Sequence, residues 1–177
     1  MKVLLISGST RSGSSNSAAL VTAAALAPRE VTTVLYHGLA TLPAFNPDHD
    51  GDCVPAPVAE LRREIEGADA VLFCTPEYAG SLPGSFKNLL DWTVGGGQLY
   101  EKPVAWLNVA AAGRGDGAQE TLAIVLGYVG AAIVEPACRH IPVDRSAIGS
   151  DGTITDLRFR TVIAEVWTEF VHHVAGR

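Results

Sequence analysis

The chain has 177 residues, of which 47 % are hydrophobic and 18 % are charged, and its formal net charge at pH 7 is −6. A chain of this size with so many apolar and so few charged residues is expected to fold rather than remain disordered, as a single domain over residues 1–177. The net negative charge gives no reason to expect binding to nucleic acid or to an anionic membrane, which normally requires a basic patch.

The sequence contains no pattern typical of a membrane or secreted protein. Its longest uncharged apolar stretch, 121–134, is interrupted by two glycines and is shorter than a membrane span. The apolar run near the N-terminus is too short for a signal sequence. The cysteines are odd in number and lack metal-ligand spacing; they are Cys53, Cys74 and Cys138. We therefore expect a cytoplasmic protein without a metal site.

Short apolar runs alternate with segments of helical pattern along the chain. The apolar runs predict strands at 2–7, 31–36, 68–75, 103–111 and, in broken form, 131–141. The segments between and after them predict helices at about 17–27, 56–67, 83–94, 117–129 and 156–174. Strands and helices that alternate in this way indicate a parallel α/β sheet with helices on both faces.

Three loops that follow predicted strands have an unusual composition: the first is rich in Ser and Gly, the second contains two Pro and a Gly, and the third is rich in Gly. They are 8–16, 76–83 and 111–118. In open parallel sheets, ligands bind beyond the carboxyl ends of the strands, where the strand order reverses. We therefore expect these three loops to meet and to form the functional site.

The first loop reads GSTRSGSSN and leads into a predicted helix. The leading N–H groups of a helix are unpaired and partly positive, so this position suits a phosphate group. The loop adds two glycines, the hydroxyl groups of Ser9, Ser14 and Ser15, and the planar charged donor Arg11. This combination predicts a phosphate site; the alternative is a polar loop in which Ser15 or Asn16 merely caps the helix.

The composition of the first loop favours a bound cofactor phosphate over phosphoryl transfer. The loop lacks both the Gly-Lys-Ser/Thr ending of a Walker loop and the GxGxxG spacing of dinucleotide-binding proteins. A phosphatase of the cysteine type would begin its phosphate loop with a nucleophilic Cys, whereas this loop contains only Ser.

The second and third loops have features that suit a flat heterocycle. In TPEYAGSLPGSFKNLLDW at 75–92, two prolines stiffen the backbone and Gly80 permits a positive φ. Such a loop can bind the polar edge of a ring through its backbone groups, while Tyr78 covers part of the ring face. The alternative is a structural turn in which Tyr78 is a packing residue. The third loop, AAAGRGDGAQ at 110–119, is either the opposite wall of that ring site or a flexible surface turn.

Together these motifs resemble the NADPH-dependent FMN reductase family, flavodoxin-like enzymes that include quinone, chromate and azo-dye reductases. The matching stretches are GSTRSGSSN at 8–16 and PEYAGSLPGSFKNLLDW at 76–92, and GLATLPAFNPD at 38–48 is also similar. The similarity extends over about residues 2–135, although TVGGGQLYEKP after Trp92 departs from the family pattern. The resemblance implies a flavodoxin-like, doubly wound sheet of five parallel strands in the order 2-1-3-4-5.

The resemblance also implies FMN as the cofactor and NADPH or NADH as the co-substrate. It assigns the FMN phosphate to the first loop, at Ser9, Arg11, Ser14, Asn16 and Ser17, and the hydroxyl group of Ser15 is added from the composition of the loop. It assigns the isoalloxazine ring to the second loop, at Pro76, Glu77, Tyr78, Gly80 and Ser81, with a less closely matched contribution from Gly113 and Arg114. No side chain is assigned as a catalytic residue, because the flavin N5 would carry the chemistry.

The predicted function is therefore electron transfer from a nicotinamide nucleotide through FMN to a small acceptor. The acceptor classes of the family are quinones, azo compounds, metal oxyanions and free flavin, used in a ping-pong mechanism. Two other functions stay open at this point: a non-enzymatic electron carrier of the flavodoxin type, and an FMN-dependent redox-sensing protein. The presence of Arg11 and the mild net charge favour the enzyme over the carrier.

Three further expectations concern residues outside the loops. The apolar residues Phe86, Leu89, Leu90 and Trp92 predict that helix 83–94 lies at the interface of a homodimer or homotetramer. Cys74 is expected to be a small buried hydrophobic residue rather than a nucleophile. Lys87 and Asp91, four residues apart on one helix, are expected to pair or to face a partner subunit.

Overall fold

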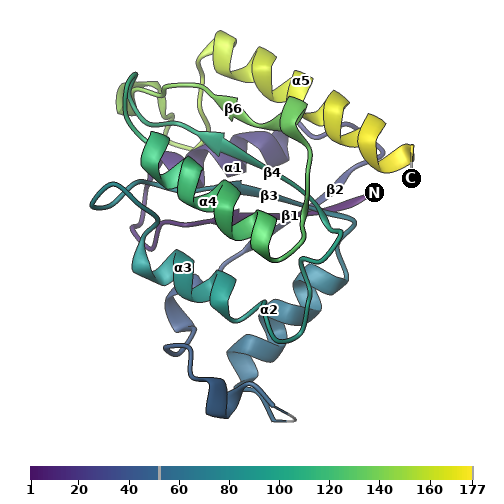
Figure 1. Cartoon of the computed structure of the whole chain (residues 1–177). Coiled ribbons are helices and arrows are strands. Elements are labelled where there is room, and N and C mark those ends of the chain that lie inside the picture. The colour runs from purple at the N-terminus through teal and green to yellow at the C-terminus, as the bar shows by residue number, and fades with distance from the viewer. Residues whose placement is uncertain (52, 177) are drawn as a thin grey trace.

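The computed structural model describes residues 1–51 and 53–176, and its centre is a parallel sheet (Figure 1). The strands follow the order β2-β1-β3-β4-β5, and β6 also pairs with β4. Their bounds are β1 Lys2–Ser7, β2 Thr32–Tyr36, β3 Ala70–Cys74, β4 Pro103–Asn108, β5 Ala132–Ile133 and β6 Arg139–His140. Every pairing is parallel. The predicted flavodoxin-like sheet and its strand order are therefore confirmed.

In the described part of the chain, five α-helices cover the sheet (Figure 1), and they match the predicted segments closely. They are α1 Ser15–Ala25, α2 Ala56–Glu66, α3 Gly84–Asp91, α4 Asp116–Tyr128 and α5 Leu157–Ala175. Helices α1 and α5 pack on one face, whereas α2, α3 and α4 pack on the other. Among residues 1–51 and 53–176, no helix has both the length and the apolar character needed to cross a bilayer.

The strands alternate their side chains between two separate hydrophobic cores. Val3 and Leu5 of β1 lie in the core beneath α1 and α5, while Leu4 and Ile6 lie in the core beneath the other helices. All four side chains are fully buried because helices cover both faces of the sheet. This is why the strand reads as a continuous apolar run.

The broken fifth strand of the sequence analysis corresponds to two short strands. Strand β5 pairs with the start of β4, and β6 pairs with its end. A 3₁₀ turn over Glu135–Ala137 separates them and contains Pro136, which has no N–H to donate to a sheet. As a result, β6 lies beside the carboxyl end of β4.

The long loop after β2 is fastened to α3 by polar side chains. Asn88 accepts from the Phe45 N–H at 2.7 Å and donates to the Pro43 carbonyl at 2.9 Å. The indole N–H of Trp92 donates to the same Pro43 carbonyl at 2.9 Å, and the Arg62 Nε donates to the Trp92 carbonyl at 3.0 Å. Two residues of the KNLLDW motif thus hold the loop over this helix.

The packing of α3 corrects the expectation that the apolar residues of helix 83–94 are exposed. The apolar residues that motivated it are fully buried inside the chain itself; they are Phe86, Leu89, Leu90 and Trp92. These four side chains therefore supply no apolar surface for a partner subunit, and an interface on this helix stays a prediction without that argument. Lys87 and Asp91 form an ion pair at 2.6 Å, which is the first of the two alternatives predicted for them.

Gly8 provides a test of how closely the sheet and α3 are packed. A Cβ at this position would lie 2.2 Å from Thr75 Oγ1 and 2.6 Å from Thr75 Cβ, so Gly8→Ala should destabilise the fold by about 1–3 kcal/mol. Gly127, in α4, has open space around it, and Gly127→Ala should stabilise the fold by up to about 1 kcal/mol. Urea unfolding of both variants checks the contrast, and equal stabilities would contradict it.

Candidate functional site

The three predicted loops meet at the carboxyl ends of β1, β3 and β4, on the left of Figure 1. A cavity of about 250 Å³ lies between them. It is lined by Ser15, Asn16, Thr75, Pro76, Glu77, Val109, Ala110, Arg114 and Gly115. The lining combines residues from all three loops, as expected for a ligand site of an open parallel sheet. Thr75, Val109, Ala110 and Gly115 were not singled out from the sequence.

The first loop is held in place by a small network of serine hydroxyl groups. Ser14, not Ser15 or Asn16, is the N-cap of α1, and its Oγ accepts from the Ser17 N–H at 3.0 Å. The Ser14 hydroxyl donates to Ser17 Oγ at 2.9 Å, and Ser17 Oγ lies 3.1 Å from Ser7 Oγ. The hydrogen bond between the hydroxyl groups of Ser14 and Ser17 therefore stabilises the loop.

The remaining donors of the first loop are free. Within the described residues, no hydrogen bond is donated by the backbone N–H groups of Thr10, Ser12, Gly13, Ser14 and Ser15. Gly13 adopts a φ of +62°, and the exposed Arg11 guanidinium has no partner in the same part of the chain. Unpaired N–H groups before a helix, a nearby guanidinium and hydroxyl groups form a donor set that fits a phosphate.

Asn16 connects the first loop to the end of β3. It is 8 % exposed and lines the cavity, and its Oδ1 accepts from the Cys74 thiol at 3.4 Å. Its amide N–H₂ donates no hydrogen bond within residues 1–51 and 53–176 and is free for a ligand. Burial raises the pKa of Cys74 far above its ordinary value, so the thiol stays protonated and remains a donor. The expectation of a buried, unreactive Cys74 is confirmed.

The second loop contains a tight turn from Tyr78 to Ser81. The Tyr78 N–H donates to the Ser81 carbonyl at 2.9 Å, and the Ser81 N–H donates back to Tyr78 at 3.0 Å. The two central residues, Ala79 and Gly80, have φ values of +52° and +73°, the pattern of a type I′ turn. The Tyr78 side chain is 56 % exposed, which excludes the alternative that it is a buried packing residue.

The third loop is fixed by Asn108, a fully buried polar residue that the sequence analysis did not identify. Its Oδ1 accepts from the Ala110 N–H at 2.9 Å, and its Nδ2 donates to the Arg114 carbonyl at 3.2 Å. Gly115, with a φ of +89°, packs against the same amide, and a Cβ there would lie 2.6 Å from its side-chain atoms. The loop is therefore an ordered wall of the cavity rather than a flexible turn.

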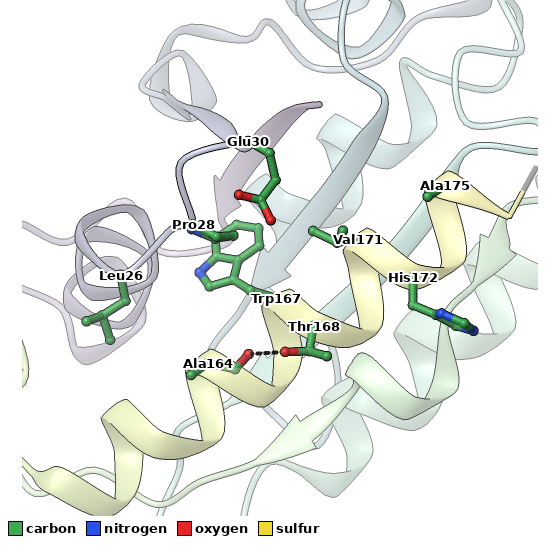
Figure 2. A pocket seen from close by; sticks show the side chains of 9 residues that line it. All are labelled: Leu26, Pro28, Glu30, Ala164, Trp167, Thr168, Val171, His172 and Ala175. Carbon is green, nitrogen blue, oxygen red and sulfur yellow. Dashed lines mark hydrogen bonds between the residues drawn. The ribbon is translucent and has the colours of Figure 1, made fainter.

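A larger hollow of about 580 Å³ lies between α5 and the segment after α1, and Figure 2 shows the side chains around it. It is lined mainly by apolar groups, with Trp167 and Val171 from α5 opposite Leu26 and Pro28. The Thr168 hydroxyl at its edge is bonded to the Ala164 carbonyl at 3.0 Å. None of the predicted site residues lines this hollow, so size alone does not identify the functional site.

Comparisons with known proteins point to one family. The model of the NADPH-dependent FMN reductase family matches residues 1–144. An NAD(P)H-dependent FMN reductase of Pseudomonas aeruginosa is 46 % identical over 92 residues, which are 52 % of this chain and 49 % of that protein, about half its length. A 2-hydroxy-1,4-benzoquinone reductase of a Burkholderia species is 31 % identical over 100 % of this chain and 98 % of its own.

The solved structures lead to the same family. The flavoenzyme NAD(P)H:(acceptor) oxidoreductase FerB of Paracoccus denitrificans superposes with a TM-score of 0.80 at 29 % identity, over 99 % of this chain and 97 % of that one. The fold is thus shared with a flavoenzyme. The chain belongs to the NADPH-dependent FMN reductase family, enzymes whose cofactor is FMN and whose reductant is a nicotinamide nucleotide.

Proposed function

We propose that this chain binds FMN between its three loops and passes electrons from NADPH or NADH to a small acceptor. The observation that carries the proposal is the free donor set before α1, placed beside a cavity that all three loops line. An anion at the start of a helix is stabilised by the unpaired N–H groups and by the helix dipole. The terminal phosphate of FMN has the charge and the acceptor atoms that such a set requires.

In this proposal, the first loop binds the phosphate. The donors are the free backbone N–H groups of Thr10 and of residues 12–15, the Ser9 and Ser15 hydroxyl groups and the Arg11 guanidinium. Ser14 and Ser17 act mainly by holding the loop in shape, because their hydroxyl groups bond to each other. Asn16 contributes the free N–H₂ of an amide whose orientation Cys74 fixes.

The second and third loops border the isoalloxazine ring. Pro76, Glu77 and Arg114 line the cavity, and we propose that Tyr78, Gly80, Ser81 and Gly113 of the same loops also contact the ring. The Tyr78 and Ser81 N–H groups are used within the turn, so the backbone donors of this loop left for the ring are those of Glu77, Ala79 and Gly80. Ala79 is thus an addition to the residues proposed from the sequence.

FMN supplies the hydride-accepting and electron-donating chemistry, so the protein needs only to bind, orient and partly expose it. The ionisable side chains that line the cavity are Glu77 and Arg114, and these two do not form a general acid and base pair. Because a single opening would serve both substrates in turn, we propose a ping-pong mechanism. The acceptor is a quinone, an azo compound, a metal oxyanion or free flavin, with quinones favoured by the full-length similarity to the Burkholderia enzyme.

We also propose a homodimer or homotetramer, located in the cytoplasm. With α3 covered, the support for an interface comes instead from exposed apolar side chains on α4. Ile124 is 59 % exposed and Tyr128 is 90 % exposed, one helical turn apart on the same face. Light scattering of the purified protein measures the number of subunits.

The absorption spectrum of the purified protein tests the central proposal. We expect flavin bands that bleach under anaerobic NADPH or NADH and recover when a quinone is added. Initial rates at several fixed quinone concentrations should give parallel double-reciprocal lines, as a ping-pong order requires. A protein that takes up FMN but is not reduced by either nucleotide would instead be a carrier or a sensor.

Arg11→Ala tests the phosphate role of the first loop. Because a hydrogen bond to a charged group contributes about 1.5–3 kcal/mol, this change should weaken FMN binding by roughly tenfold or more. Binding of riboflavin, which lacks the phosphate, should change little, and so should the stability of the apo-protein, since Arg11 is exposed. Arg29→Ala, at an exposed arginine far along the chain, is the matched control. Equal losses for FMN and riboflavin would show that Arg11 does not bind the phosphate.

Gly80→Ala tests the turn that borders the ring. Its φ of +73° disfavours any side chain, so the change should cost about 1–2 kcal/mol in FMN binding if the turn must keep its shape. Gly84→Ala is the control, because Gly84 has open space and no positive φ. Fluorescence titration with FMN measures both, and unchanged affinity in Gly80→Ala would remove the turn from the site.

A further inference from the structure

Helix α4 begins without a cap of its own. Its N-cap residue is Gly115, which has no side chain to accept a hydrogen bond from the first turn. The Ala118 N–H of that turn donates instead to Glu77 Oε2 at 3.2 Å, from a loop 41 residues earlier. A carboxylate at the start of a helix is favourable because it satisfies an unpaired N–H group and complements the helix dipole.

Two further contacts place the second loop along the first turns of α4. Gly117 lies against the Gly80 carbonyl so closely that a Cβ would be 2.3 Å from its oxygen. Ser81 Oγ lies 3.2 Å from Thr121 Oγ1, and the Thr121 hydroxyl donates to the Gly117 carbonyl at 2.7 Å. The second loop and the start of α4 therefore form one packed unit.

The start of α4 is also the end of the third loop. Arg114 precedes Gly115 directly, and its carbonyl accepts from the buried Asn108 amide. The position of Arg114 at the cavity is thus fixed by two things: the hydrogen bond from Asn108 to its carbonyl, and the place where α4 begins after Gly115. Any group that fixes the start of α4 against the second loop also fixes Arg114.

We propose that Glu77 is a positioning residue, which caps α4 and thereby fixes the Arg114 loop against the second loop. This inference rests on the proposed FMN site and deepens it. Glu77 lines the cavity, but its carboxylate acts on FMN through α4 and Arg114 rather than by binding the ring. The role accounts for an acidic side chain at a site whose ligand is an anion.

The test compares Glu77→Ala with Glu77→Gln in FMN titrations of the full chain. Glutamine keeps an oxygen acceptor for the Ala118 N–H, so its FMN dissociation constant should stay within about twofold of the parent, whereas alanine should raise it about five- to tenfold. Glu120→Ala, at an exposed acid on the same helix, is the matched control and should bind FMN normally. Should glutamine be as weak as alanine, or alanine as tight as the parent, the proposal is wrong.

A double-mutant cycle with Arg114→Ala separates positioning from direct contact. If Glu77 acts through the Arg114 loop, Glu77→Ala should change the dissociation constant by less than about twofold once Arg114 is absent. Fully additive losses would show that Glu77 acts on the ligand independently, and would overturn the proposal.

Hydrogen exchange of the Ala118 amide gives a readout without FMN. Exchange should be at least about tenfold faster in Glu77→Ala than in the parent, and slow again in Glu77→Gln. Persistent protection in the alanine variant would contradict the cap. If the parent protein failed to bind FMN at all, the proposed function would fall, while this exchange comparison would still decide whether Glu77 fixes α4.

Discussion

The close approach of the ends of β1 and β3 is the constraint on which the site depends. The Gly8 N–H donates to the Cys74 carbonyl at 2.9 Å, and the missing side chain of Gly8 leaves room for Thr75. The first loop leaves the sheet from this point, so its position relative to the second loop is set by backbone contact. The Cys74 thiol then reaches Asn16 in the first turn of α1. A larger residue at position 8 would separate the two loops before any ligand could bind between them.

The two helices that begin at this edge use their N-termini in different ways. In α1, the cap comes from Ser14 within its own loop, and the neighbouring N–H groups stay free for an anion. In α4, the cap comes from Glu77 of another loop, which satisfies an N–H group with a protein carboxylate. One terminus is thus available to a ligand, and the other joins two loops of the chain. The same physical property of a helix serves binding in one place and assembly in the other.

The sheet and the first loop could be predicted because their signals are local. Apolar runs such as KVLLIS indicate strands buried on both faces, and the cluster of Ser, Gly and Arg before a helix indicates an anion site. Contacts between distant segments carry no such signal. Two hydrogen bonds here join residues more than 40 positions apart. Trp92 donates one to the Pro43 carbonyl, and the Ala118 N–H donates the other to Glu77. For this reason the apolar residues of helix 83–94 were taken for exposed surface, and the contact between Glu77 and α4 was not foreseen.

Net charge and local charge have different consequences in this molecule. The chain carries a formal charge of −6, which by itself would repel a phosphate or a nicotinamide nucleotide. At physiological salt, however, charges are screened over about 8 Å, so the groups next to the loops dominate. Arg11 and Arg114 are exposed and unpaired within the described residues, unlike Arg62, which is bonded to Asp50 and to the Trp92 carbonyl. Two free guanidinium groups and unpaired N–H donors therefore lie in the loops, so the negative net charge does not by itself exclude an anionic ligand there.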